Sequence, residues 1–234
     1  MTQRFLEVSN LHGWYGASHV LHGVDFHVDE GEVVTLLGRN GAGRTSTLRA
    51  IMGLIGARKG SIKVKDNETV HLATHRIARL GIGYCPEERG IFSSLSAEEN
   101  LLLPPRLGDG GMSVQQIYAM FPNLRERAAS QGTRLSGGEQ QMLAVARILR
   151  TGARLLLLDE ISEGLAPVIV QKLGEVVRGL REQGYTIVMV EQNFRFAAPL
   201  ADRFLVMEHG QVIQQFSQAE LPARMARLHE YLGV

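Results

Sequence analysis

Hydrophobic and polar residues alternate near the start of the chain, as they do in β-strands that face the core on one side only. Residues 5–8 and 24–28 follow this pattern. The segment Val33–Leu37 is instead dense in apolar and β-branched residues, and it ends in a glycine-rich loop. Such a run is typical of a strand that is buried on both faces. We therefore predict half-buried early strands followed by a central buried strand.

Helical spacing of apolar residues begins after this loop. It predicts a helix from about Arg44 to Met52. A short strand is predicted over Ile82–Cys85, and the chain then has helical character from about Glu88 to Arg150. Within that region, residues 103–111 are rich in Pro and Gly and predict a surface loop.

Strands and helices alternate again in the last third of the chain. The pattern predicts, in order, strand Arg154–Leu158, a helix from about Pro167 to Glu182, strand Thr186–Val190, helix Asn193–Leu200, and a hairpin of residues 204–207 with 212–215. Such alternation is typical of a mostly parallel sheet with helices on both faces. The predicted fold class is therefore α/β, with antiparallel β additions in the N-terminal part and at the closing hairpin, and with an inserted α-helical region.

Composition narrows the class of protein. The chain has 234 residues, of which 44% are hydrophobic and 21% charged, a globular make-up. The net charge of +1 lacks the basic excess of a nucleic-acid binder, so no nucleic-acid partner is expected. Apolar runs such as Leu155–Leu158 are far shorter than the roughly 20 residues of a membrane span, and residues 1–10 lack a signal-peptide core. With Cys85 as its single cysteine, the chain is expected to be cytoplasmic unless a partner holds it at a membrane.

A phosphate-binding loop is predicted between the strand at 33–37 and the helix that follows it. Glycines let the backbone turn its N–H groups inward, and the helix N-terminus adds partial positive charge, so phosphate oxygens are bound there. The Thr45 hydroxyl is expected to bind Mg²⁺. A glycine-rich turn without a ligand is the competing interpretation. The loop residues are Gly38, Arg39, Asn40, Gly41, Ala42, Gly43, Arg44, Thr45 and Ser46.

Arg44 stands where this motif requires lysine. A guanidinium has the same charge as an ammonium but a broad planar shape. Binding can survive on backbone contacts and charge, whereas loss of one well-placed donor costs about 3–4 kcal/mol of transition-state stabilisation. The sequence therefore predicts nucleotide binding and leaves the rate of hydrolysis at this site open.

The predicted strand Arg154–Leu158, which contains four consecutive leucines, is followed directly by two carboxylate residues. The C-terminal end of a buried strand is where α/β sheets bind ligands. Asp159 is expected to hold Mg²⁺, and Glu160 to polarise the attacking water as general base. A solvated turn is the alternative, which the phosphate loop upstream makes less favourable.

The most specific string in the chain is Leu135-Ser-Gly-Gly-Glu-Gln-Gln141. Ser136 is a good N-cap for the helix that follows. An ordinary capped helix does not explain the paired glycines, which weaken a first turn. The string therefore predicts a second anion-binding helix N-terminus.

In this order and at these separations, the three motifs resemble the ATP-binding cassette (ABC) ATPases, and the resemblance covers essentially the whole chain. It implies one ABC ATPase domain over residues 1–234 with a P-loop NTPase core. Residues 1–87 and 151–234 form the RecA-like core with its β subdomain, and about 88–150 form the helical subdomain. It also implies that two cassettes pair head to tail around ATP and Mg²⁺. The signature residues that would contact the other cassette's nucleotide are Ser136, Gly137, Gly138 and Glu139.

Other family positions carry over one by one. Tyr15 matches the aromatic residue that stacks on adenine, although a plain core tyrosine is the alternative. Glu87 replaces the usual glutamine near Mg²⁺ and still offers a hard oxygen ligand. Gln192 replaces the switch histidine, and it can hydrogen-bond a γ-phosphate as part of the catalytic set but cannot become a cation. Residues 162–165 occupy the D-loop.

The strings PEERGIF, SAEENL, LSGGEQQMLAVARIL, SEGLAP and VEQN resemble the branched-chain amino-acid importer group, whose relatives also handle amides or urea. The resemblance implies a sister ABC ATPase subunit or a homodimer, two transmembrane permease subunits and an extracytoplasmic solute-binding protein. The chain would then lie on the inner face of a bacterial plasma membrane, with apolar surface near Phe92 to Leu103 against a permease helix. The transported solute is not readable from this chain.

Three functions therefore compete. The first is an importer ATPase. The second is a soluble cassette protein of translation or DNA repair, but such proteins carry two cassettes or long insertions that this chain lacks. The third is a nucleotide-binding subunit with weak hydrolysis that regulates a sister ATPase, which Arg44 and Gln192 motivate and the intact Glu160 opposes.

Overall fold

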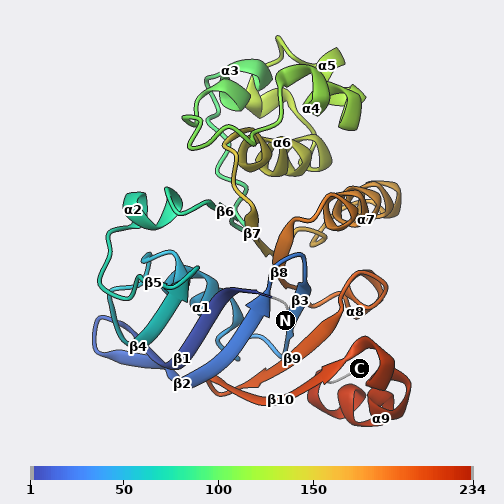
Figure 1. The fold of residues 1–234 in the computed structure, drawn as a ribbon. Coiled ribbons are helices and arrows are strands. Elements are labelled where there is room, and N and C mark those ends of the chain that lie inside the picture. Colours follow the sequence, from blue (N-terminus) through green and yellow to red (C-terminus); the bar gives the residue numbers. More distant parts are fainter. Residues whose placement is uncertain (1–2, 233–234) are drawn as a thin grey trace.

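The computed structural model describes residues 3–232, which form two β-sheets, helices around them and a separate helical lobe (Figure 1). The larger sheet has six strands in the order β10-β9-β3-β8-β7-β6. Its strands are β3 (Val33–Leu37), β6 (Ile82–Cys85), β7 (Leu155–Asp159), β8 (Thr186–Val190), β9 (Arg203–Glu208) and β10 (Gln211–Ser217).

The larger sheet is parallel except at one edge. Strands β9, β3, β8, β7 and β6 run parallel, and only β10 is antiparallel to its neighbour. Every residue of β3, β7 and β8 is buried, because helices or strands cover both faces of this sheet. The predicted mostly parallel sheet and closing hairpin are confirmed.

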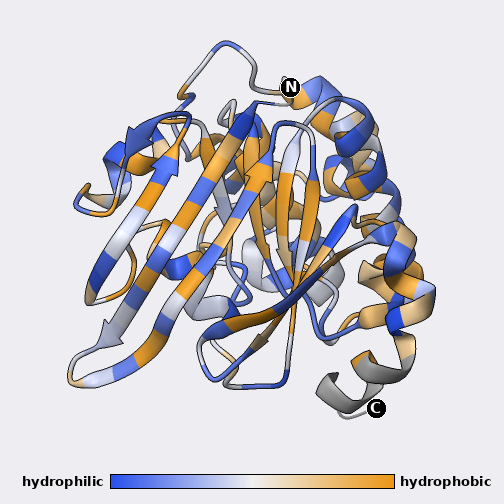
Figure 2. Cartoon of the chain, turned by 60° about the horizontal axis from the view of Figure 1, so that its bottom comes forward, coloured by the Kyte–Doolittle hydropathy of each residue, from blue (hydrophilic) through white to orange (hydrophobic). Residues whose placement is uncertain are grey.

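The smaller sheet is antiparallel and has the order β2-β1-β4-β5. It consists of β1 (Arg4–Tyr15), β2 (Ser18–Asp29), β4 (Ala57–Val64) and β5 (Asn67–Glu68). Figure 2 shows hydrophobic and hydrophilic residues alternating along its long strands. Apolar residues such as Leu6, Val24 and Ile62 point to one core that also includes residues of β3 and the first helix. The predicted early antiparallel strands are confirmed.

Helices flank the sheets and build the lobe. They are α1 (Arg44–Ile51), α2 (Thr74–Ala78), α3 (Ala97–Leu102), α4 (Val114–Met120), α5 (Pro122–Glu126), α6 (Gly137–Arg150), α7 (Pro167–Glu182), α8 (Phe194–Ala197) and α9 (Leu221–Leu232), with 3₁₀ turns at Gly132–Arg134 and Gln218–Glu220. Figure 1 shows α3 to α6 grouped beyond the ends of β6 and β7. Among the described residues, no helix is long and apolar enough to cross a membrane.

Two helix predictions differ from the structure. Helical character was expected from about Glu88, but the first helix of the lobe begins at Ala97, where Ser96 and Glu99 form a capping box. The helix expected over Asn193–Leu200 ends at Ala197, because Pro199 has no backbone N–H with which to continue the helical hydrogen bonds. Residues 103–111 form no helix, as expected of a loop.

Candidate functional site

The glycine-rich segment after β3 forms a concave loop that leads into α1. Gly43 is the N-cap of α1 and has a φ of 101°, in the left-handed region that suits glycine. Gly38 packs so closely that an added Cβ would lie 2.5 Å from the carbonyl oxygen of Met207. The loop glycines are thus required by backbone shape as well as by the motif.

This loop lines a cavity of about 430 Å³ together with Val20 of β2 and residues from three further parts of the chain. Glu87 comes from the segment after β6, Glu160 from the end of β7 and Gln192 from the segment after β8. The carboxyl ends of parallel strands meet at one edge of the sheet, so these distant residues converge there. The loop residues that line the cavity are Asn40, Gly41, Ala42, Gly43, Arg44, Thr45 and Ser46.

Asp159 is the last residue of β7, directly before Glu160, and is completely buried. Its carboxylate accepts hydrogen bonds from the Thr45 hydroxyl and from the Tyr84 hydroxyl, each at 2.9 Å. Burial raises the pKa of Asp159, and the charges of Glu160 and Glu87 add to this, while the two hydroxyl donors oppose it. A buried carboxylate with hydroxyl partners is a favourable place for a cation.

Glu160 follows Asp159 in an unusual backbone conformation, with a φ of 48°. Such a conformation costs a non-glycine residue about 1–3 kcal/mol and tends to occur at functional sites. Both carboxylate oxygens have a partner: Arg44 donates to Oε1 and Gln192 donates to Oε2, each at 2.9 Å. The side chain expected to be the general base is therefore held by Arg44 and Gln192, two of the residues that the sequence analysis identified as departures from the family pattern.

Arg44 is buried, with only 4% of its surface exposed. One Nη donates to the backbone oxygen of Glu191 at 2.9 Å, and the other donates to Glu160 and, at 3.3 Å, to Asn40. Burial lowers the pKa of Arg44, while the charge of Glu160 opposes this most strongly. Because arginine stays protonated in proteins, the group at this position is a cation with fixed protein partners.

Two groups of predicted site residues lie outside this cavity. Tyr15 is at the end of β1 and is 37% exposed, so it is free to contact a ligand and is not a core residue. The string around Ser136 lies at the N-terminus of α6 in the helical lobe, where Ser136 and Glu139 form a capping box. Gly137 and Gly138 follow in the first turn, and a Cβ on Gly138 would lie 2.9 Å from Ile169 of α7. Arg39 lines a smaller neighbouring pocket with His209.

Sequence reasoning missed Tyr84, which donates to the Asp159 carboxylate, and Glu191, whose backbone oxygen accepts from Arg44. Tyr84 was placed only on a strand, and Glu191 only within the string VEQN. Both act through contacts between strands that are far apart in the chain. Their one available signal was position, because each lies at the C-terminal end of a strand of the parallel sheet, or next to it.

Comparison with known proteins decides the family. A family model described as "ABC transporter" matches residues 21–163 of the chain. The chain belongs to the ABC transporter family. This ABC protein is an ATPase, and the predicted resemblance is confirmed.

Relatives of this ABC ATPase match along almost its whole length. It is 39% identical to "High-affinity branched-chain amino acid transport ATP-binding protein BraG" of Pseudomonas aeruginosa, over 97% of this chain and 99% of that protein. It is 32% identical to "Lipopolysaccharide export system ATP-binding protein LptB" of Escherichia coli, over 97% of each chain.

Solved structures agree with the fold. A "Structure of ATP binding subunit of ABC transporter" is 26% identical with a TM-score of 0.80, covering 98% of this ABC ATPase and 100% of that chain. A nucleotide-free ATP-binding cassette from an ABC transporter, 19% identical and with a TM-score of 0.83, covers 99% of each chain. At that lower identity the likeness concerns the fold alone.

Proposed function

We propose that this ABC ATPase binds MgATP in the cavity at residues 40–46 and hydrolyses it to power uptake of branched-chain amino acids or related small polar solutes. The observation that carries the proposal is the convergence of the phosphate loop, Glu87, Glu160 and Gln192 in one cavity. Its backbone N–H groups and helix N-terminus suit phosphate oxygens. Tyr15, exposed at the end of β1, is available to stack on the adenine.

The residues proposed for Mg²⁺ fit a hard cation that prefers oxygen ligands. The Thr45 hydroxyl and the Asp159 carboxylate are already in hydrogen-bond contact, and Glu87 lines the same cavity. In the described part of the chain, the hydrogen-bond partners of the Asp159 carboxylate are the neutral hydroxyls of Thr45 and Tyr84, which suits a carboxylate that is to hold a metal. When bound, Mg²⁺ would neutralise charge on the β- and γ-phosphate oxygens.

Glu160 is the proposed general base, and it must lose its hydrogen bonds from Arg44 and Gln192 before it can act on water. Arg44 and Gln192 donate hydrogen bonds that γ-phosphate oxygens accept equally well. Binding of ATP thus draws both donors from the Glu160 carboxylate toward the phosphate. The freed carboxylate then orients and deprotonates the attacking water.

A second cassette completes the proposed site. Within one chain, Ser136 to Glu139 lie in the helical lobe and do not line the phosphate cavity. We infer that residues of about 88–150 act as a helical subdomain that presents this string to ATP bound by a sister ABC ATPase, or by a second copy, arranged head to tail. ATP is then held between the two subunits.

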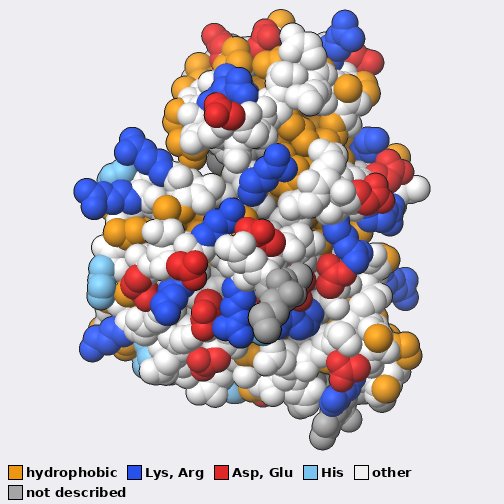
Figure 3. All heavy atoms as spheres, viewed as in Figure 1, with side chains coloured by type: hydrophobic (Ala, Val, Ile, Leu, Met, Phe, Trp, Pro, Cys, Tyr) orange, Lys and Arg blue, Asp and Glu red, His pale blue; other side chains and the backbone are white. Residues whose placement is uncertain are grey.

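The membrane partners follow from the transporter family and from the surface. Two transmembrane permease subunits are the proposed anchors, and an extracytoplasmic solute-binding protein is an indirect partner. Phe92 and Leu103 are 48% and 49% exposed. Arg147, whose guanidinium lies over the Phe92 ring, and Pro104, which follows Leu103, line a cavity of about 560 Å³. Figure 3 shows hydrophobic atoms gathered on the helical lobe, while charges of both signs are interspersed below it. On this basis we propose that the chain lies in the cytoplasm, on the inner face of a bacterial plasma membrane.

Import is the favoured direction because BraG, named for branched-chain amino acid transport, is more similar than LptB, named for lipopolysaccharide export. A transport assay tests this direction. Vesicles that carry the complex with this subunit and ATP on the inside should accumulate a radiolabelled branched-chain amino acid that is supplied outside. Accumulation of no amino acid, amide or urea, together with intact ATPase activity, would contradict the importer assignment.

One observation favours a second function, weak hydrolysis in a regulatory subunit. Glu160, the proposed general base, forms a buried ion pair with Arg44, the residue that replaces the usual lysine. The Glu160→Gln variant of the reconstituted complex separates the two functions. We expect it to abolish most of the ATPase activity that this chain's own site contributes, since an amide cannot accept the proton of water. Unchanged turnover would support the regulatory subunit instead.

A further inference from the structure

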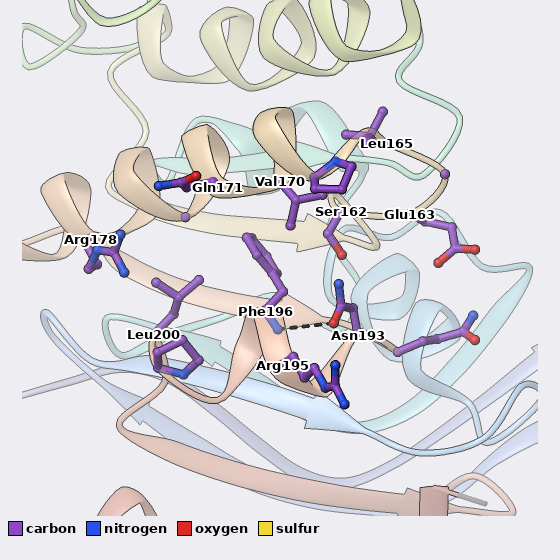
Figure 4. Close-up of a pocket in the computed structure, with 15 residues that line it drawn as sticks. Ser162, Glu163, Leu165, Val170, Gln171, Arg178, Asn193, Arg195, Phe196 and Leu200 are labelled. Atoms are coloured by element: carbon purple, nitrogen blue, oxygen red, sulfur yellow. Dashed lines mark hydrogen bonds between the residues drawn. The ribbon is translucent and has the colours of Figure 1, made fainter. Parts of the chain in front are cut away.

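Glu191 is a buried carboxylate to which the proposed function gives no role. It follows β8, precedes Gln192 and is 1% exposed. One carboxylate oxygen accepts a hydrogen bond from the Ser162 hydroxyl at 2.7 Å, and the other accepts one from the Ser162 backbone N–H at 3.2 Å. Ser162 is buried as well. Figure 4 shows it on the loop before α7, with its side chain directed toward the segment that carries Asn193.

Two further hydrogen bonds join the same pair of segments. The Glu160 backbone N–H donates to the Val190 carbonyl oxygen at 2.8 Å, and the Gln192 side chain donates to Glu160 at 2.9 Å. The segment 160–162 is thus fastened to the segment 190–192 at three successive points. The other two points both involve Glu160, whereas the contact between Glu191 and Ser162 does not.

Glu191 also contacts Arg44, the first residue of the helix that follows the phosphate loop. Its backbone oxygen accepts the hydrogen bond from Arg44 at 2.9 Å. One residue therefore touches the helix that follows the phosphate loop, the loop that follows Glu160 and, through the chain, Gln192. Two hydrogen bonds to a single serine fix the orientation of that loop more tightly than an apolar contact would.

We propose that Glu191 is a positioning residue, which fixes the loop 161–165 against Gln192 and thereby holds Glu160 in the orientation that hydrolysis requires. The inference rests on the proposed role of Glu160 as general base. It predicts that movement of the loop 161–165 is transmitted to Glu160 and Gln192 together.

Replacement by alanine and by glutamine tests this role. Glutamine keeps both contacts, because its amide oxygen accepts from the Ser162 N–H and its NH₂ donates to the Ser162 hydroxyl oxygen. In the assembled complex we expect Glu191→Ala to lower kcat by about 10- to 100-fold, while KM for ATP changes less than about threefold. Glu191→Gln should keep kcat within about threefold of the unmodified chain. Unchanged kcat in Glu191→Ala, or an equal loss in Glu191→Gln, would overturn the proposal.

A double-mutant cycle identifies the partner. Ser162→Ala removes one of the two hydrogen bonds, so the combined variant should lose no more activity than Glu191→Ala alone. Losses that multiply would show that the two residues act separately and would overturn the proposal. Glu182→Ala is the matched control, because Glu182 is an exposed carboxylate at the far end of α7, and its kcat should be unchanged.

A stability measurement tests the contact without relying on hydrolysis. Burial raises the pKa of Glu191 to about 7, while the hydrogen bonds from Ser162 oppose this, the Glu160 charge adds to it and the Arg44 charge opposes it. The folded state thus binds more protons here than the unfolded state, so this residue's contribution to stability falls as pH rises from about 4.5 to 7. Glu191→Gln should remove that fall, so its stability relative to the unmodified chain should increase over this pH range. An identical pH dependence in both chains would contradict the buried contact.

These readouts separate two kinds of failure. If the unmodified complex hydrolyses no ATP, the proposed function fails. The pH dependence of unfolding then still decides whether Glu191 is held as the structure shows. If the complex is active and Glu191→Ala is as active, the positioning role alone fails.

Discussion

At the scale of single residues, Arg44 is the point at which this ABC ATPase departs most from its family's pattern. The guanidinium bridges Glu160, Asn40 and the backbone of Glu191, which needs several N–H groups in one plane. An ammonium on a flexible stem is unable to reproduce this planar arrangement. The pair with Glu160 is also buried, so its strength depends on this particular geometry.

The first prediction concerns the Arg44→Lys variant. Lysine should hold Glu160 less firmly and reach between phosphates, so we expect kcat of the assembled complex to stay equal or to rise by up to about tenfold. Steady-state hydrolysis with saturating MgATP measures this, and nucleotide affinity of the isolated subunit serves as the control. A tenfold loss of kcat at unchanged affinity would mean that the site has been rebuilt around the guanidinium.

Sequence patterns located the candidate site residues better than the residues that hold them in place. Thr45, Asp159 and Glu160 stand in motifs, so their convergence at the ends of parallel strands was predictable. Tyr84 lies 75 residues before Asp159 along the chain, and its hydroxyl reaches that carboxylate only because β6 pairs with β7. Contacts of this kind depend on side-chain direction at paired strand ends, which periodicity does not determine.

At the scale of elements, predictions were most accurate where the pattern was strongest. The buried strands β3 and β8 and the amphipathic helix α7 have the predicted bounds, because their apolar runs or stripes end at clear breaks. The strand β4, the short helix α2 and the C-terminal helix α9 were not predicted. Most residues of β4 are exposed or only partly buried, so no apolar period marks it.

The packing of helix α6 supplies a second reason for glycine at position 138. Gly138 is buried against Ile169 of α7, and an added methyl would lie 2.9 Å from that side chain. Sequence reasoning assigned the glycine to anion binding, and close packing against α7 now stands beside that role. Both requirements favour a residue without a side chain.

This packing predicts opposite effects of one substitution at two helical glycines. Gly179 of α7 has no heavy atom within 4 Å of an added Cβ. Gly179→Ala should therefore raise the free energy of unfolding by about 0.5–1 kcal/mol. Gly138→Ala should instead lower it by about 1 kcal/mol or more, because the methyl overpacks the contact with α7. Urea denaturation of both variants measures this, and an equal gain in both would disprove the packing argument.

At the scale of the whole molecule, the sequence predicted a nucleotide core with an inserted helical region, and the structure has helices α3 to α6 grouped away from the sheets (Figure 1). The sequence was unable to show how the connection into this lobe is fixed. Asn100 is fully buried, and its side-chain NH₂ group donates hydrogen bonds to the carbonyl oxygens of Phe92, Leu95 and Ser96. The apolar surface around Phe92 is therefore held in place before any partner binds.

A final prediction follows from this preformed surface. Phe92→Asp combined with Leu103→Asp places two carboxylates where the proposed permease helix packs, and each exposed apolar side chain buried there contributes about 1.5–3 kcal/mol. We expect the affinity for detergent-solubilised permease to fall at least about tenfold, while MgATP affinity of the isolated subunit is unchanged. Ile213→Asp is the control, because Ile213 is 37% exposed on β10, an edge strand of the larger sheet and not part of the helical lobe. If the control weakens assembly as much as the double variant, the permease binds the sheet edge and not this lobe.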